Sequence, residues 1–294
     1  MNCGDGVELK ADKDTTFYIA LPQGNYEGLK FEFKGGKVWD TTLNMVIHAG
    51  KIRAKELTGV NVMKYVPEGA ISGVFTINDG GGKVFFSKGN LQATWDGSKY
   101  NWGFAASQQD YVGKNPGNTN IDNLQPGDVV DFFGWSTSAT NYGINTSMEY
   151  SVYSGSFREW GEAFGTDSKW HTLSSDEWTY LIDTREVKGE SGYGKTCVIT
   201  QLNDGKFGLI IFPDDYTGTT TASELTSIPE GCVFLPAPGN RAGSEVFNVE
   251  TDGSYWSSTQ SGDQYACFLA LAYHEVIYNF RWNGFSVRLV QDVE

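Results

Sequence analysis

The C-terminal stretch from Gly253 to Val290 constrains the fold most strongly. It holds apolar and aromatic segments at Ser254–Ser258, Cys267–Tyr273 and Phe285–Val290, with a fourth at Val276–Phe280, separated by polar or glycine-containing turns. Short runs of this kind between turn residues are typical of an antiparallel meander. A strand made from the last residues can pair only after the rest of its domain exists, so we expect this sheet to close the fold.

The composition indicates a folded, strand-rich protein with many loops. The 294 residues suffice for two domains, and the chain is 39% hydrophobic with nine Trp, fifteen Tyr and 36 Gly. The formal net charge of −14 disfavours nucleic acid and anionic membrane surfaces as partners, because their phosphate groups would be repelled. No apolar run reaches the roughly 20 residues that a membrane-spanning helix needs.

Several motifs, taken in order, resemble a known family. YWSST at 255–259 is followed by RWNGFSVRLV at 281–290, and upstream lie FSKGNLQ at 86–92, DFFGWSTS at 131–138, WHTLSSDEWTYLIDTR at 170–185, GLIIFPDDY at 208–216 and VFLPAPGNR at 233–241. They resemble the C-type-lectin-like domain of surface proteins from anaerobic Gram-negative gut bacteria, a fold shared with the formylglycine-generating enzymes. The resemblance implies an α+β domain at 67–294 with few helices and an antiparallel sheet. It indicates function less closely, because one fold hosts many activities.

A shorter resemblance covers the N-terminal part. FYIALPQGNY at 17–26 resembles the closing portion of a fimbrillin-type pilin domain, in which this phrase precedes an amphipathic hairpin and an apolar last strand. Strands are predicted at Thr15–Leu21, Leu29–Lys34, Lys37–Val46 and Lys51–Val62. We expect a small all-β domain at 1–66, which either packs on the larger domain or is the remaining part of an incomplete sandwich, with Pro67–Gly69 as linker.

The resemblance implies an exported protein at the cell surface, on the outer membrane or a fimbria. Met1–Asp12 has neither the basic start nor the apolar core of a secretory leader, so we expect a leader to be missing from the sequence. Cys3-Gly4-Asp5 resembles the start of a mature lipoprotein, and a plain exposed thiol is the alternative reading.

The clearest helix is predicted at Ser175–Arg185, with Ser174 as N-cap and Glu177 as its capping-box partner. A second short helix is expected at Thr221–Ile228 and one helical turn within Ser156–Phe164. The long polar and aromatic segment 106–170 is expected to be an insertion of the kind that often carries function.

The sequence offers little support for a metal centre or for catalysis. Cys3, Cys197, Cys232 and Cys267 show no C-x-x-C spacing; a disulfide between Cys232 and Cys267 and buried free thiols are both open readings. The three histidines, His48, His171 and His274, lie in different segments without metal-pair spacing.

Asp214-Asp215 after an apolar strand can bind calcium or supply a catalytic carboxylate, but is more often simply solvated. Trp282-Asn283 is followed by Gly284 instead of the aspartate of a lectin calcium site. The reactive cysteine pair of the formylglycine-generating enzymes has only Cys267 in its region. We therefore expect no metal, no cofactor and no enzyme activity.

Exposed aromatic and planar polar side chains can stack on sugar rings or contact a protein surface. The expected ligand-binding residues are Arg241, Trp256, Tyr278, Arg281, Trp282 and Asn283. The alternative is that Trp256 and Trp282 belong to the core and that Arg281 and Arg288 form structural ion pairs.

The function expected from the resemblance is a non-enzymatic cell-surface adhesin, as a pilus tip or accessory subunit. Its partners would be a glycan or a host or bacterial surface protein, and other pilus subunits through strand donation. A carbohydrate-binding surface lipoprotein for glycan capture is the first alternative. An enzyme of the formylglycine-generating fold is the second.

Overall fold

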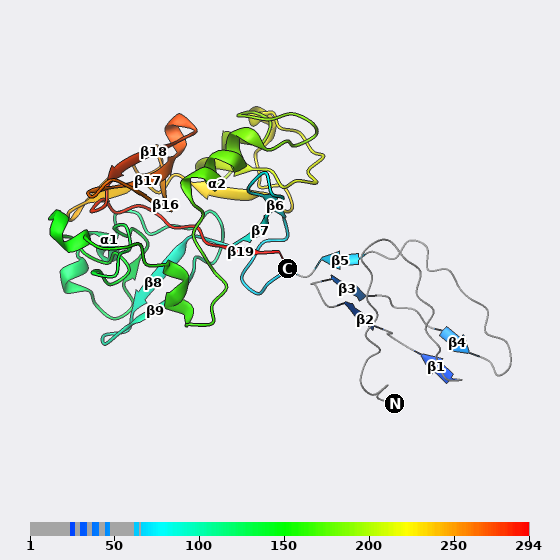
Figure 1. Cartoon of the computed structure of the whole chain (residues 1–294), viewed down its shortest axis with the longest axis horizontal. Helices are drawn as coiled ribbons and strands as arrows, with labels where there is room; N and C mark the ends of the chain where they lie inside the picture. The colour runs from blue at the N-terminus through cyan, green and yellow to red at the C-terminus, as the bar shows by residue number, and fades with distance from the viewer. Residues whose placement is uncertain are drawn as a thin grey trace. The chain divides into compact units, whose positions relative to one another are not determined.

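The computed structural model describes residues 66–293 in full and, before them, the backbone of five short strands. The chain divides into two compact units, Met1–Tyr65 and Val66–Glu294, a division one residue away from the boundary expected from sequence. Figure 1 labels helices and strands of the chain.

The described strands of the first unit form two small antiparallel sheets. One pairs β1 with β4 and the other has the order β2-β3-β5. The bounds are β1 Gly24–Tyr26, β2 Lys30–Phe33, β3 Lys37–Asp40, β4 Met45–Ile47 and β5 Val62–Lys64. The prediction of one continuous strand at Lys37–Val46 is wrong, because β3 and β4 join different sheets. The predicted strands at 15–21 and 51–61 lie outside the described residues.

The second unit is built mainly from small antiparallel sheets, as its alternating segments predict. The sheet orders are β10-β8-β9, β11-β12-β13, β14-β15, β16-β17-β18 and β19-β7-β6. The strands are β6 Phe75–Thr76, β7 Lys83–Phe86, β8 Leu91–Trp95, β9 Tyr100–Phe104, β10 Val129–Val130, β11 Cys197–Gln201, β12 Phe207–Ile211, β13 Val233–Pro236, β14 Asn240–Ala242, β15 Glu245–Phe247, β16 Ser254–Ser261, β17 Tyr265–Ala270, β18 Glu275–Phe280 and β19 Val290–Asp292.

Helices in the described part are few and short. They are α1 Pro116–Thr119, α2 Ser175–Thr179, the π-helical turn η4 Tyr180–Thr184, and the 3-10 turns η1 Ile121–Asn123, η2 Tyr150–Tyr153, η3 Trp160–Phe164, η5 Ala222–Glu224 and η6 Leu271–Tyr273. None is long and apolar enough to cross a membrane. The helix predicted at Thr221–Ile228 is reduced to the single turn η5, whereas the turn expected within 156–164 is present as η3.

The predicted capping box begins α2. The hydroxyl of Ser174 accepts a hydrogen bond from the amide of Glu177 at 3.3 Å, and the amide of Ser174 donates to the Glu177 carboxylate at 2.8 Å. These bonds satisfy backbone donors that have no partner within the helix. The predicted helix therefore starts where expected and continues as η4 to Thr184.

The sheet β16-β17-β18 separates two hydrophobic cores. Tyr255 and Leu269 contribute to one core, while their neighbours Trp256 and Phe268 contribute to the other. Successive side chains of a strand point to opposite faces, so these neighbours in sequence serve different cores. The sheet is therefore covered on both faces along much of its length.

The C-terminal end departs from the predicted meander. The segment Phe285–Val290 does not form a fourth strand of the sheet; it makes isolated bridges to Phe133 and Tyr255 before β19 begins. β19 then pairs with β7, with Val290 opposite Phe86. Figure 1 shows this segment running between the β16-β17-β18 sheet and the β8–β9 hairpin. The end of the chain thus joins the first strands of its own domain.

Candidate functional site

The six residues expected to bind a ligand do not share one exposed surface. Arg241 and Trp256 are fully buried, and Arg281 and Asn283 are buried as well. Tyr278 is 63% exposed and Trp282 is partly exposed. Only the last two can contact a ligand on the surface of the domain through their side chains.

Trp256 is a core residue, as the alternative reading of the sequence has it. Its indole nitrogen donates a hydrogen bond to the carbonyl of Phe133 at 2.7 Å. Its ring lies 4.4 Å from that of Phe285 and 6.0 Å from that of Phe268, measured between centroids. Burial of a large aromatic ring with a hydrogen-bonded N–H stabilises the fold. It leaves neither the ring face nor the indole N–H available to a ligand.

Arg281, which follows the end of β18, forms hydrogen bonds with the turn between β16 and β17 and with the loop after η2. Its guanidinium donates to the carbonyls of Gly262 at 2.9 Å, Tyr265 at 3.3 Å, Tyr153 at 3.3 Å and Gly155 at 3.4 Å, and lies over the ring of Trp135 at 4.5 Å. Burial lowers the pKa of this guanidinium. The five donors of an arginine suit converging carbonyls. Arg281 therefore has a structural role at the site.

Arg241 and Arg288 also donate to uncharged oxygens. Arg241 donates to the carbonyls of Gly243 at 2.6 Å and Phe132 at 3.4 Å, and Arg288 to the carbonyl of Phe234 and the side-chain oxygen of Gln108. Burial lowers the pKa of each guanidinium to about 10. The ion pairs expected for Arg281 and Arg288 are replaced by these carbonyl and amide contacts.

Four aromatic residues near β18 form a continuous series, here named the aromatic strip, in which Tyr278 is exposed and Tyr265, Phe280 and Trp282 are partly exposed. The centroid of Tyr265 lies 5.6 Å from that of Tyr278 and 4.6 Å from that of Phe280, and Phe280 stacks on Trp282 at 5.2 Å. Tyr265 and Phe280 are direct cross-strand partners and Tyr278 is two residues from Phe280, so the three rings share a face of the sheet.

The strip is bordered by polar and acidic side chains. Asp263 and Gln264 are exposed in the turn between β16 and β17, directly before Tyr265. Tyr278, Tyr265 and Trp282 also carry a hydroxyl or indole N–H, each able to form a hydrogen bond beside its apolar ring. An apolar row with a hydrogen-bonding border can hold a ligand that has one apolar and several polar faces.

The sequence analysis named Tyr278 and Trp282 of the aromatic strip but not Tyr265 and Phe280. The alternation of Tyr278, Phe280 and Trp282 at every second position was a usable signal for one face of a strand. Tyr265 joins this row only through the register of β17 against β18, which the sequence pattern does not give.

The cysteines are free thiols among the residues that the structure describes. Cys197 and Cys232 are buried and Cys267 is partly buried, so the disulfide reading for Cys232 and Cys267 is wrong. Burial raises the pKa of Cys197 and of Cys232 to about 12 and also raises that of Cys267. These thiols are therefore protonated, and poor nucleophiles, at neutral pH.

The remaining candidates for chemistry have structural partners. Asp214 accepts from the amide and hydroxyl of Thr76 and from Arg185 at 3.1 Å. His171 lies 3.2 Å from Asp292, and His274 stacks on Tyr193 at 3.8 Å between centroids; His48 lies outside the described residues. Within the described chain, no group of three or more His, Cys, Asp and Glu side chains could hold a metal ion.

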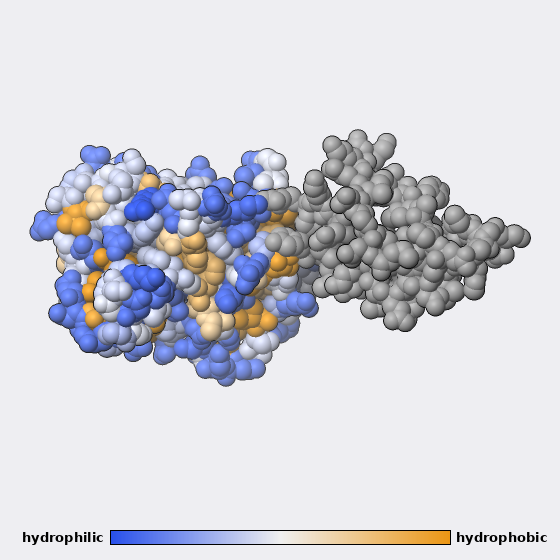
Figure 2. Space-filling view, turned by 90° about the horizontal axis from the view of Figure 1, so that it is seen from below, coloured by the Kyte–Doolittle hydropathy of each residue, from blue (hydrophilic) through white to orange (hydrophobic). Residues whose placement is uncertain are grey.

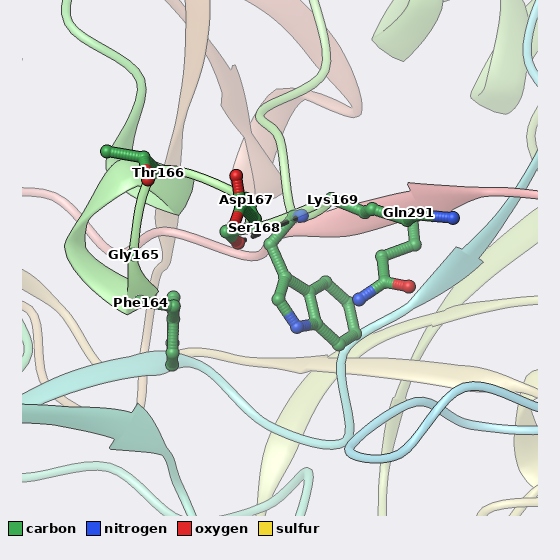
Figure 3. Close-up of a pocket in the computed structure, with 8 residues that line it drawn as sticks. Phe164, Gly165, Thr166, Asp167, Ser168, Lys169 and Gln291 are labelled. Carbon is green, nitrogen blue, oxygen red and sulfur yellow. Dashed lines mark hydrogen bonds between the residues drawn. The ribbon is translucent and has the colours of Figure 1, made fainter.

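A second surface feature is a shallow, open hollow at the loop 164–170. Its volume is about 600 Å³, and Figure 3 shows Phe164 and the following loop residues on one side and Gln291 of β19 on the other. The face seen in Figure 2 is mainly hydrophilic, with hydrophobic residues in separate small areas. The labelled side chains around the hollow are mostly polar, among them Thr166, Asp167 and Ser168.

Comparison with known proteins adds no relative to this picture: no family model, no curated protein and no solved structure matches the chain.

Proposed function

We propose that the protein is a non-enzymatic cell-surface adhesin whose second unit, with a C-type-lectin-like fold, binds its ligand through the aromatic strip. The observation that carries the proposal is the unbroken ring series from Tyr278 to Trp282, which ends in a tyrosine that is 63% exposed. Large exposed aromatic rings cost free energy in water, and a row of them beside polar groups is typical of a binding surface.

A glycan suits this surface better than other small ligands. The C–H face of a pyranose ring is apolar and stacks on aromatic rings, while its hydroxyls can bond to Asp263, Gln264 and the tyrosine hydroxyls at the border. Asp263 and Glu275 carry negative charge, and the whole chain has a net charge of −14. Neutral or amino sugars are therefore favoured over sialylated or sulfated ones.

The first unit supplies the link to an assembly in this proposal. Its five described strands form two small sheets, one of two strands and one of three. Sheets of this size are marginal alone and gain stability when a further strand is added. The proposal assigns that addition to a neighbouring pilus subunit, which places the protein at a pilus tip or in an accessory position.

The test is a glycan-array screen of the full chain, with and without calcium, repeated with Trp282→Ala. We expect selective binding of neutral or amino glycans that does not need calcium and falls severalfold in the variant, because Trp282 stacks on Phe280 and closes the strip. Tyr273→Ala is the matched control, since Tyr273 is 69% exposed and lies outside the strip.

Two outcomes would contradict the proposal. One is binding that is equally strong in wild type and Trp282→Ala, with both proteins folded by circular dichroism. The other is selective binding of sialylated or sulfated glycans, which the acidic border of the strip opposes.

A further inference from the structure

Strand β18 lies at the edge of its sheet, which has the order β16-β17-β18 (Figure 1). On its inner side, Asn279 pairs with Ala266 and Ile277 with Phe268. The amide of Arg281 donates to the carbonyl of Gln264 at 3.0 Å. Since hydrogen-bonded and non-hydrogen-bonded pairs alternate along an antiparallel pair of strands, this bond shows which residues of β18 are bonded to β17. The backbone groups of Asn279 and Ile277 therefore point toward β17, and those of Val276, Tyr278 and Phe280 point outward.

The outward amide and carbonyl of Phe280 already form hydrogen bonds with Asn279 and Asn283. Its amide donates to the side-chain oxygen of Asn279 at 2.8 Å. Its carbonyl accepts from the amide of Asn283 at 3.1 Å and from the Asn283 side chain at 3.3 Å. Pairing along the outer edge consequently ends at Phe280.

The outward backbone groups of Val276 and Tyr278, unlike those of Phe280, have no hydrogen-bond partner in the described part of the chain. Within residues 66–293, their outward amides and carbonyls form no backbone or side-chain hydrogen bond. Two N–H and two C=O groups spaced along one strand are a template for a short added strand. The sequence EVIYNF of β18 contains no lysine or proline, the residues that commonly block such edges.

The outer edge of β11, in the same domain, is hydrogen-bonded to a neighbouring segment of the chain. On the outer side of β11, the hydroxyl of Tyr193 accepts from the amide of Ile199 at 3.2 Å, and the amide of Gly194 donates to the carbonyl of Cys197 at 2.7 Å. Part of the β11 edge is thus covered by the chain itself, whereas the outward backbone groups of Val276 and Tyr278 on β18 are open.

The charges around β18 indicate what it would accept. Glu275 is exposed at its start, and Asp263 is exposed in the turn beside its other end. Burial raises the pKa of Asp183, and the negative charge of Glu275 raises it further. The two carboxylates are therefore close enough to interact. Burial lowers the pKa of His274, which favours its neutral form. The flanks of the edge are thus acidic, and a basic segment is complementary to them.

We propose that the outer edge of β18 accepts an extended basic peptide segment of a partner protein as an added strand, bonded to the backbone of Val276 and Tyr278. This interaction uses backbone groups and goes beyond the proposed glycan binding, which uses the side chains of the aromatic strip. The edge strand β9 is flanked by Asp96 and Lys99, charges of both signs, and lacks this complementarity.

The experiment uses the full chain, labelled with ¹⁵N, and an acetylated, amidated heptapeptide of alternating lysine and valine. We expect chemical-shift changes and slowed amide exchange at Val276 and Tyr278. A peptide with the same sequence and N-methyl groups on alternate residues should bind about 30-fold more weakly, because two hydrogen bonds of about 1 kcal/mol each are lost.

Two variants separate this edge from the glycan site. Val276→Pro removes an outward N–H without removing a ladder bond, and prolines of this kind are tolerated on edge strands; it should abolish peptide binding and retain glycan binding. Tyr278→Ala keeps the backbone and removes a ring of the strip, so it should retain peptide binding within about threefold and weaken glycan binding about tenfold.

The proposal is overturned if the wild-type chain shows slowed exchange at Tyr100–Phe104 of β9 and not at β18, or at neither edge with millimolar peptide. It is also overturned if an alternating glutamate–valine peptide binds as tightly. These readouts come from the wild-type protein and do not depend on whether either variant folds.

Discussion

At the scale of single residues, burial decides the role of the polar and aromatic side chains. Trp256 and Trp282 lie in the two C-terminal motifs that carry the family resemblance, yet the first is fully buried and the second is partly exposed. Arg281 is buried against carbonyl oxygens contributed by two loops. An aromatic or arginine side chain serves a core and a binding surface equally well, so composition alone could not separate the two roles.

Asp131 is a buried carboxylate whose titration should be measurable. It accepts from the amide of Val112 at 2.6 Å and from the side chain of Asn118 at 2.7 Å. Burial outweighs these hydrogen bonds and raises its pKa from 3.8 to about 6. Since the pKa is higher in the folded state than in the unfolded state, this group stabilises the fold below pH 4, and its contribution is lost as the pH rises through 6.

We therefore predict a pH-dependent difference between the wild type and Asp131→Asn. The free energy of unfolding of the wild type, relative to the variant, should fall by about 3 kcal/mol between pH 4 and pH 7.5, at about 1.4 kcal/mol for each unit of pKa shift. Urea unfolding of both proteins across this range measures it. A difference that stays constant with pH would show that Asp131 does not titrate in this way.

At the scale of elements, the start of α2 was predicted correctly, whereas the strand partner of the C-terminal segment was not. The capping box at Ser174 and Glu177 defines the start of α2 because both of its bonds are local. The apolar segment Phe285–Val290 was predicted as a strand of the last sheet. Instead its end leads into β19, which pairs with β7 some two hundred residues earlier in the chain. The spacing of apolar residues and the positions of turn residues indicate that a segment is extended, but they do not specify which strand it pairs with.

The capping box gives a prediction at this scale. Ser174→Ala removes the acceptor for the Glu177 amide and should destabilise the protein by about 1 kcal/mol, lowering Tm by roughly 2–4 °C. Thermal unfolding followed by circular dichroism measures the shift. Thr221→Ala is the control, because Thr221 precedes η5 without a side-chain cap. Equal Tm values for Ser174→Ala and Thr221→Ala would contradict the assigned role.

At the scale of the whole molecule, the protein combines a small strand unit with a larger β-rich unit that presents one organised aromatic surface. The division near residue 66 was accessible from sequence, because the residue pattern changes there and a Pro-Glu-Gly linker follows. The aromatic strip could be predicted only in part. Tyr278 and Trp282 were named from the sequence, whereas Tyr265 and Phe280 required the register of β17 and β18.

The central claim is that ligand binding depends on the aromatic strip, and Tyr278 is its most exposed ring. The most direct measurement is a calorimetric titration of the full chain with the best glycan from the array, comparing Tyr278→Ala with the control Tyr273→Ala. Loss of one stacking ring should weaken binding by roughly 1–2 kcal/mol, a Kd increase of about tenfold, with no change in the control. Equal affinities for the wild type and a folded Tyr278→Ala variant would contradict the claim.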